Sequence, residues 1–383
     1  MECRCCGAKL PEKALLKLEN MPKSAQFFPN WEEAENETGV CLELYECSYC
    51  GLLQLSGEPV PYFRDVIRAT GVSEEMRAFR EAQFSEWVER NSLRGKKVLE
   101  IGCGNGDYMA CMEKAGADVC GIEHGEAAFK EALSAGHRVF RLFLENERTV
   151  VEGAPYDGFF IMNFLEHLPK PGPFLRAIAN NLALGAYGIV EVPNTDMILE
   201  QGLYSELIQD HLLYFREDTL RRMLEWNGFE VLSCKKVCND YIISAEVRRK
   251  KPLDVSDLLK KREETRQKCH EFFRKMRSAG KKIAVWGAGH QALANLSLLD
   301  MKDYIDIVVD SASFKQKKLT PATHIPVESP HILTQGNVGA VLVMAGSYSE
   351  EVSSLVKENH PEIVCAVLRE NGNVEEIRSG GGN

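Results

Sequence analysis

Hydrophobic and polar positions along most of this chain follow one pattern, in which short apolar runs alternate with stretches of helical periodicity. Between residues 95 and 250, the apolar runs are short enough to be strands, and turn residues separate them from the helical stretches. The predicted strands are 97–101, 117–122, 139–142, 158–162, 188–192, 231–236 and 241–247. Alternating strands and helices predict an α/β fold built on a doubly wound sheet.

A second, smaller pattern of the same kind follows a charged amphipathic helix predicted at 252–277. Its strands are predicted at 282–286, 305–310, 340–344 and 363–368, so this half is a second Rossmann-like α/β domain. A chain of 383 residues is long enough for two or three domains. We predict a small module at 1–60, a core with a leading helix at 61–250, and the linker helix with the second domain at 251–383.

A glycine-rich turn in the core organises the chain. Gly102, Gly104 and Gly106 follow an apolar strand and precede a helix with an apolar face, and glycines let a ligand approach the backbone closely. NAD sites and S-adenosylmethionine (SAM) sites both use such turns. Two acids favour SAM: Glu100 is placed to hold the amino end of its methionine moiety, and Glu123, at the end of the next strand, to accept both ribose hydroxyls.

Other polar residues follow predicted strands at the edge where ligands bind in such sheets. Asn163 is assigned to the cofactor site, and Asn194 is predicted to contact the substrate. His167 is either a general base or substrate ligand, or a histidine that caps a helix. Asp210 and His211 place a carboxylate beside an imidazole, which could supply a base, although Asp210 could instead cap a helix.

The N-terminal module carries two Cys-x-x-Cys pairs, and each pair is followed by glycine. Two such turns can close a tetrahedral site, so we predict a structural zinc ion held by four thiolates. A redox pair and unrelated free thiols are the alternatives. The predicted ligands are Cys3, Cys6, Cys47 and Cys50.

Composition excludes some classes of partner. The formal net charge of −10 argues against nucleic acid or a membrane as a partner bound by bulk charge. No apolar run is long enough to span a bilayer, and the N-terminus is not that of a signal peptide. We therefore expect the 13 cysteines to be thiols or metal ligands in the cytoplasm.

The second domain opens on another glycine turn, Trp286-Gly-Ala-Gly-His290. This turn could bind NAD, but the amides at the start of its helix are better suited to a substrate phosphate. A sheet without any ligand is the third possibility.

The order of a four-cysteine module, a Glu-x-Gly-x-Gly-x-Gly core and a second Rossmann-like domain resembles the zinc-containing, SAM-dependent sugar C-methyltransferases of deoxysugar pathways. The resemblance covers nearly the whole chain and is most specific in the last domain. Its motifs are Leu165-Glu-His167, Trp286-Gly-Ala-Gly-His290, Ile307-Val-Val-Asp310, Lys315-Gln-Lys-Lys318 and Thr323-His-Ile-Pro-Val327.

The resemblance implies methylation of the carbon next to the ketone of a nucleotide-linked keto-deoxysugar. In that reaction, His211 would remove a proton, Asp210 would orient His211, and His167 or a neighbouring donor would stabilise the enolate. The sequence departs from the family where Ile208-Gln-Asp-His211 stands for Tyr-His-Glu-His, and where Val66 and Arg68 stand for two tyrosines. The residues predicted to contact the substrate are Tyr214, Asn194 and His290.

Three other functions remain open. A SAM-dependent methyltransferase with this fold could instead methylate oxygen, nitrogen or another carbon of a different small molecule. The second is an RNA methyltransferase with a zinc ribbon. The excess of acidic over basic residues and the lack of a basic, aromatic-rich stretch argue against it. A protein that senses NAD through its last domain, with a vestigial core, would not be an enzyme.

Overall fold

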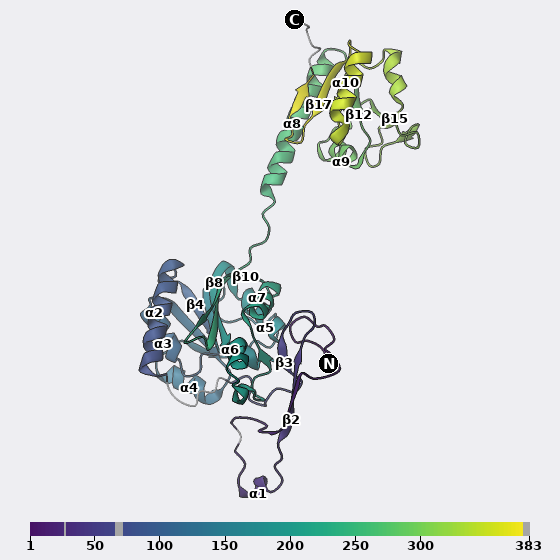
Figure 1. Cartoon of the computed structure of the whole chain (residues 1–383). Helices are drawn as coiled ribbons and strands as arrows, with labels where there is room; N and C mark the ends of the chain where they lie inside the picture. Colours follow the sequence, from purple (N-terminus) through teal and green to yellow (C-terminus); the bar gives the residue numbers. More distant parts are fainter. Residues whose placement is uncertain (27, 66–71, 378–383) are drawn as a thin grey trace. The chain divides into compact units, whose positions relative to one another are not determined.

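The computed structural model describes residues 1–26, 28–65 and 72–377. Val66, Arg68 and residues 379–383 lie outside the described residues. The chain forms two compact units, Met1–Pro252 and Leu253–Asn383 (Figure 1). The division of the first unit into a separate module and core stays a prediction.

The first unit contains a seven-stranded mixed sheet with the order β10-β11-β8-β7-β4-β5-β6. Strands β4 to β8 run parallel to one another, and β10 and β11 add an antiparallel edge that begins at β8. This architecture confirms the predicted doubly wound α/β fold. The strands are β4 (Lys97–Ile101), β5 (Asp118–Glu123), β6 (Val139–Arg141), β7 (Tyr156–Met162), β8 (Leu182–Pro193), β10 (Phe229–Val237) and β11 (Ile242–Arg249).

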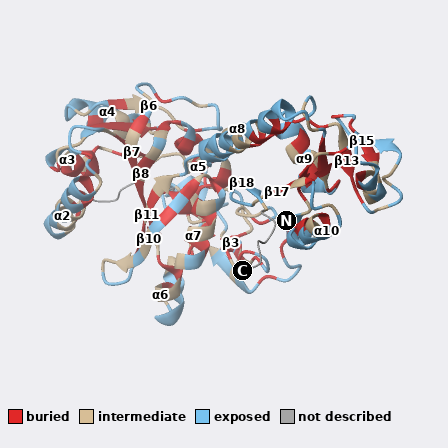
Figure 2. Ribbon diagram, turned by 90° about the horizontal axis from the view of Figure 1, so that it is seen from above, coloured by how far each residue is buried: buried red, intermediate tan, exposed pale blue. Residues whose placement is uncertain are grey.

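Helices cover both faces of this sheet, so its central strands are buried and read as continuous apolar runs (Figure 2). Val98 packs with α2 and α3 on one face, and Leu99 packs with α5 and α7 on the other. The helices are α2 (Glu74–Arg90), α3 (Asp107–Lys114), α4 (Glu126–Ser134), α5 (Pro171–Asn180), α6 (Thr195–Glu200) and α7 (Glu217–Trp226), with 3-10 turns η1 (Leu165–His167) and η2 (Tyr204–Glu206).

A four-stranded antiparallel sheet begins in the N-terminal module and ends in the core. Its order is β1-β2-β3-β9, with β1 (Leu16–Met21), β2 (Val40–Glu46), β3 (Leu53–Leu55) and β9 (Leu213–Tyr214). The pairing of Leu53 with Tyr214 joins the module to a core loop. The short helix α1 (Trp31–Ala34) lies in the long connection between β1 and β2.

The second unit holds another seven-stranded sheet, with the order β14-β15-β13-β12-β16-β17-β18. Its central strands are parallel, as the strand-helix pattern predicted. The elements are α8 (Ser256–Ser278), β12 (Ile283–Trp286), α9 (His290–Leu298), β13 (Ile307–Val309), β14 (Lys318–Leu319), β15 (Pro326–Glu328), η3 (Pro330–Gln335), β16 (Ala340–Val343), η4 (Gly346–Tyr348), α10 (Ser349–Asn359), β17 (Val364–Leu368) and β18 (Val374–Glu376). Across the described part of both units, every helix is too short or too polar to cross a bilayer.

A buried ion pair fixes helix α2 to the sheet. The Arg80 Nη1 atom lies 2.6 Å from Glu191 Oε2 on β8, and both side chains are fully buried. Gln83 donates to the second carboxylate oxygen at 2.7 Å, and the guanidinium lies over the ring of Tyr108. Because neither charge reaches water, each depends on the other for compensation.

We expect Glu191→Ala to lower the free energy of unfolding by about 3–5 kcal/mol, because it leaves a buried guanidinium without its counter-charge. Denaturant unfolding followed by the fluorescence of the buried Trp87 measures this. The matched control is Glu230→Ala, which breaks the exposed 2.7 Å pair with Arg248 and should cost less than about 1 kcal/mol. Equal losses in the two variants would contradict this account of α2.

Candidate functional site

The predicted glycine turn connects β4 to α3 at the carboxyl edge of the sheet. Gly102, Gly104 and Gly106 have φ values of +69°, +56° and +91°, which glycine adopts without strain. Gly106 caps α3, and a Cβ atom there would lie 2.4 Å from the ring of His137. The turn therefore requires glycine for its backbone conformation and, at Gly106, for space as well.

Glu123 ties this turn to the next loop. It ends β5, and its buried carboxylate accepts hydrogen bonds from Gly104 N at 2.9 Å and from Gly125 N at 2.6 Å. Glu100 is buried on the neighbouring strand β4. Burial, followed by the charges of Glu100 and Glu123, raises the pKa of the Cys103 thiol. The two predicted cofactor acids are thus brought together beside the turn.

A cavity of about 320 Å³ opens at the same edge of the core. Its wall contains four of the residues that the sequence singled out, and these are Asn163, His167, Asp210 and His211. Asn163 directly follows β7 with a φ of +48°, and its Oδ1 atom is buried without a hydrogen-bond partner among the described residues. Residues 25 and 26 of the N-terminal module also line this cavity.

The two histidines of the cavity lie edge to face, with ring centroids 4.8 Å apart. The Nδ1 atom of His167 lies 2.8 Å from the backbone oxygen of Asp210. Since a carbonyl only accepts, Nδ1 carries the proton and Nε2 presents a lone pair. Burial lowers the pKa of His167, and burial together with His167 lowers the pKa of His211 to about 3. Both rings are therefore neutral near pH 7.

Asp210 acts differently from the prediction that it orients His211. Its carboxylate accepts from Tyr62 Oη at 2.7 Å and from Ala25 N at 2.9 Å. Its backbone oxygen holds His167 instead. A loop without regular periodicity does not fix which way neighbouring side chains point, so adjacency in sequence was a poor guide.

Two residues of the cavity were missed by the sequence analysis. Tyr62 donates to Asp210 and accepts from Gln26 N at 3.0 Å, but it lies at the predicted boundary between the module and the core, where the sequence analysis named no site residue. Glu166 is buried, and burial raises the pKa of its carboxyl to about 8. Its place beside His167 in the Leu-Glu-His motif was the available signal.

Two residues predicted to contact the substrate are used by the fold instead. Asn194 caps α6 by accepting from Asp196 N at 3.1 Å, and it donates to Asp240 O at 2.7 Å. The buried hydroxyl of Tyr214 accepts from Ile208 N at 3.1 Å and so holds the loop that leads to His211. Neither is among the residues that line this cavity.

The four predicted zinc ligands converge in the N-terminal module. The sulfur atoms of Cys3 and Cys50, and those of Cys6 and Cys47, are 3.5 Å apart, and all four lie within 4.8 Å of one another. Four Zn–S bonds of about 2.3 Å in a tetrahedron separate the sulfurs by about 3.8 Å. The side chains present therefore fit a closed structural zinc site.

The glycine turn of the second unit is held by Asp310. The carboxylate accepts from Ala288 N at 2.8 Å and from Lys315 Nζ at 2.9 Å. Gly287 has a φ of +122°, and a Cβ atom there would lie 2.6 Å from Met344 O. His290 lines a cavity of about 830 Å³ beside this turn. A ligand for this turn stays a prediction.

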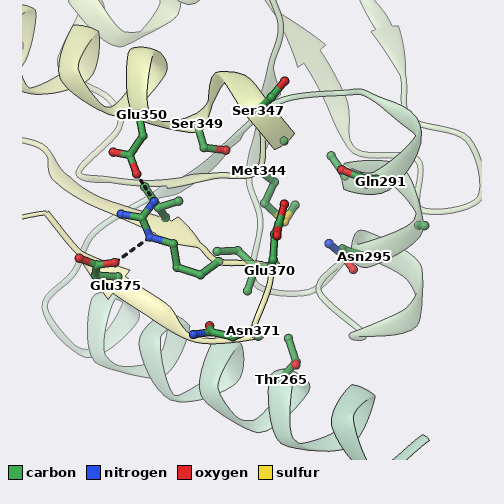
Figure 3. A pocket seen from close by; sticks show the side chains of 17 residues that line it. Thr265, Gln291, Asn295, Met344, Ser347, Ser349, Glu350, Glu370, Asn371 and Glu375 are labelled. Carbon is green, nitrogen blue, oxygen red and sulfur yellow. Dashed lines mark hydrogen bonds and ion pairs between the residues drawn. The ribbon is translucent and has the colours of Figure 1, made fainter. Parts of the chain in front are cut away.

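A second cavity of this unit, of about 980 Å³, lies between α9, α10 and the end of β17 (Figure 3). Its wall is acidic, with Glu350, Glu370 and Glu375. Arg369 pairs with two of these acids, Glu350 and Glu375. Since its one arginine is already paired, this cavity is poorly suited to an anion.

We expect removal of metal from the cysteine site to unfold the N-terminal sheet, because the four thiolates are its main cross-link. Hydrogen exchange of β2 with and without a chelator, together with the zinc content, measures this. Cys41→Ser is the control, because Cys41 is exposed and lies outside the cluster. Unchanged exchange in the metal-free protein would contradict a structural zinc site.

Comparison with known proteins gives two matches to protein-family models. Residues 76–234 match a methyltransferase domain, and residues 246–364 match a C-methyltransferase C-terminal domain. Curated relatives include ubiquinone biosynthesis O-methyltransferases of Bordetella avium, 38% identical over 101 residues, and Hahella chejuensis, 37% identical over 103 residues. These matches cover 24% and 26% of this chain, and the chain spans only 42% and 43% of those relatives.

Similar solved structures include a SAM-dependent methyltransferase from Clostridium acetobutylicum, with a TM-score of 0.38 and 13% identity over 45% of this chain and 92% of that one. Another is the magnesium protoporphyrin IX methyltransferase from Synechocystis with bound S-adenosylhomocysteine, with a TM-score of 0.37 and 18% identity over 48% of this chain and 90% of that one. The two family models therefore identify a methyltransferase domain at residues 76–234 and a C-methyltransferase C-terminal domain at residues 246–364.

Proposed function

We propose that this chain transfers the methyl group of SAM to the carbon next to the ketone of a nucleotide-linked keto-deoxysugar. The observation that carries the proposal is the match of residues 246–364 to a C-methyltransferase C-terminal domain. The cavity at the carboxyl edge of the sheet supports it, because methylation at carbon requires removal of a proton, and the imidazoles of His167 and His211 line this cavity.

The cofactor is proposed to occupy the turn between β4 and α3. Glu123 would accept the ribose hydroxyls, Glu100 would hold the amino group, and the Oδ1 atom of Asn163, which has no hydrogen-bond partner among the described residues, would face the reacting end. SAM supplies an electrophilic methyl group on a sulfonium. The chain's own part is to align the acceptor carbon with that methyl group and to keep water out.

Proton transfer is assigned to His211, the candidate base. Its neutral ring would accept the proton from the carbon next to the ketone, while the C–H electron pair forms the enolate and negative charge develops on oxygen. His167 cannot donate to that oxygen in the tautomer observed, because its proton points to Asp210 O. The Tyr62 hydroxyl is a donor on the same wall.

A structural zinc ion at the four cysteines is part of the same proposal, and the module it cross-links forms one wall of the acceptor cavity. The backbone amides of Ala25 and Gln26 bond to Asp210 and Tyr62. The module therefore contributes to the acceptor site as well as to folding.

A second candidate function is methyl transfer to oxygen, nitrogen or another carbon of a different small molecule. The names of the curated relatives, which are O-methyltransferases, favour it. The position of the new methyl group, determined by NMR with ¹³C-methyl-labelled SAM, separates the two functions, because a methyl group on carbon and one on oxygen differ in shift and coupling.

We expect one nucleoside diphosphate to bind selectively to the protein saturated with S-adenosylhomocysteine. Calorimetric titration with TDP, UDP, GDP and CDP measures this, because the nucleoside diphosphate part of the acceptor should contribute binding energy independently of the sugar. Absence of binding by all four would reject the nucleotide-linked acceptor and leave the second candidate function.

We expect His211→Ala to lower kcat by about 10²–10⁴-fold, the usual contribution of a proton-transfer group. Affinity for S-adenosylhomocysteine should not change. Steady-state rates at saturating acceptor give the comparison, with His331→Ala on the exposed η3 turn as the control. A near-normal kcat in His211→Ala would remove this residue from proton transfer.

A further inference from the structure

Three side chains of metal-binding type meet on one wall of the 320 Å³ cavity. A carboxylate oxygen of Glu166 and a ring nitrogen from each of His167 and His211 all lie within 4.8 Å of one another. Glu166 and His167 belong to η1, and His211 lies in the loop before β9. The backbone bond of 2.9 Å from Leu212 N to Glu166 O holds these two segments together.

The hydrogen bond at the far side of His167 is the kind that orients a metal ligand. Its Nδ1–H group donates to the backbone oxygen of Asp210 at 2.8 Å, which fixes the ring and leaves the lone pair of Nε2 toward Glu166. Histidines that bind metals nearly always donate their other ring N–H to a carbonyl or a carboxylate. The hydrogen bond that would orient one ligand is therefore already in place.

Glu166 is a buried carboxyl group that makes no short ion pair with any described residue. Its side chain is 2% exposed, and Oε2 has no hydrogen-bond partner among the described residues. The shortest ion-pair distance, from Oε1 to His167 Nε2, is 3.9 Å. This exceeds the roughly 3.2 Å limit for a shared proton. A separation of 3.9 Å is compatible with two ligand atoms on one ion, because two metal–ligand bonds of about 2.0–2.2 Å allow up to about 4 Å between the ligand atoms.

We propose that Glu166, His167 and His211 bind a divalent transition-metal ion such as Mn²⁺, Fe²⁺ or Zn²⁺. Two imidazoles and one carboxylate suit these ions and leave coordination positions free. Because the site lies on the cavity wall, those positions face the cavity and would take an oxygen atom of the acceptor. The ion differs from the structural zinc, since thiolates and a closed tetrahedron form that other site.

This inference goes beyond the proposed function, because it requires the cavity but no particular acceptor. It also gives His211 a different role while the ion is bound, since a coordinated nitrogen cannot accept a proton. Loss of metal binding and loss of methyl transfer are measured separately, so failure of one proposal is distinguishable from failure of the other.

The test is a titration of the full chain, with zinc retained at its cysteines, with Mn²⁺ followed by electron paramagnetic resonance. We expect one Mn²⁺ per chain, with nitrogen coupling from coordinated imidazole in the pulsed spectrum and an unchanged zinc content. Glu166→Gln and His211→Ala should each weaken Mn²⁺ binding at least tenfold, since loss of even a group that is hydrogen-bonded to a metal ligand costs about 10–100-fold.

The matched control is Asp65→Asn, which removes a carboxylate that lines the same cavity but pairs with His124 at 2.6 Å. It should bind Mn²⁺ like the unaltered protein. Circular dichroism checks the fold of each variant, and His211→Ala decides the matter if Glu166→Gln does not fold. Absence of nitrogen-coupled Mn²⁺, or equal affinity in all folded variants, would overturn the proposal.

Discussion

The carboxylate of Glu123 makes two hydrogen bonds on which the geometry of the site depends. One goes to the amide of Gly104 in the turn after β4, and the other goes to Gly125 in the loop after β5. Both loops leave the carboxyl edge of a parallel sheet, where helix N-termini and free backbone amides converge. The left-handed backbone of the turn is maintained because this buried acid holds it in place.

The acceptor side of the site is built from less regular pieces. The 3-10 turn η1 supplies Glu166 and His167, a loop before β9 supplies His211, and the N-terminal module closes the wall through Ala25. Strand β9 pairs with β3 of that module. The module that the sequence assigns to structural zinc thus also helps to shape the cavity that we propose as the acceptor site.

The features that sequence predicted well are those that local chemistry determines. The strand-glycine-helix corner needs residues with positive φ, and the cysteine pairs need two short turns, so both can be recognised within a few residues. Tyr62 and Glu166 were missed because their importance comes from distant segments that meet them. Asn194 and Tyr214 bond to the backbone, as a polar side chain near a strand end can, and their contact with the substrate stays a prediction.

The central claim is that the turn after β4, held by Glu123, is the cofactor site. Its most direct test is calorimetric titration with S-adenosylhomocysteine of the unaltered chain, of Glu123→Ala, and of Asp118→Asn. Asp118 is the exposed acid at the start of the same strand, where it pairs with Arg138. We predict that each chain binds one S-adenosylhomocysteine. Glu123→Ala should bind it about ten- to a hundredfold more weakly, because hydrogen bonds to a charged group are lost. The affinity of Asp118→Asn should be unchanged. Equal affinity in all three proteins would contradict the assignment.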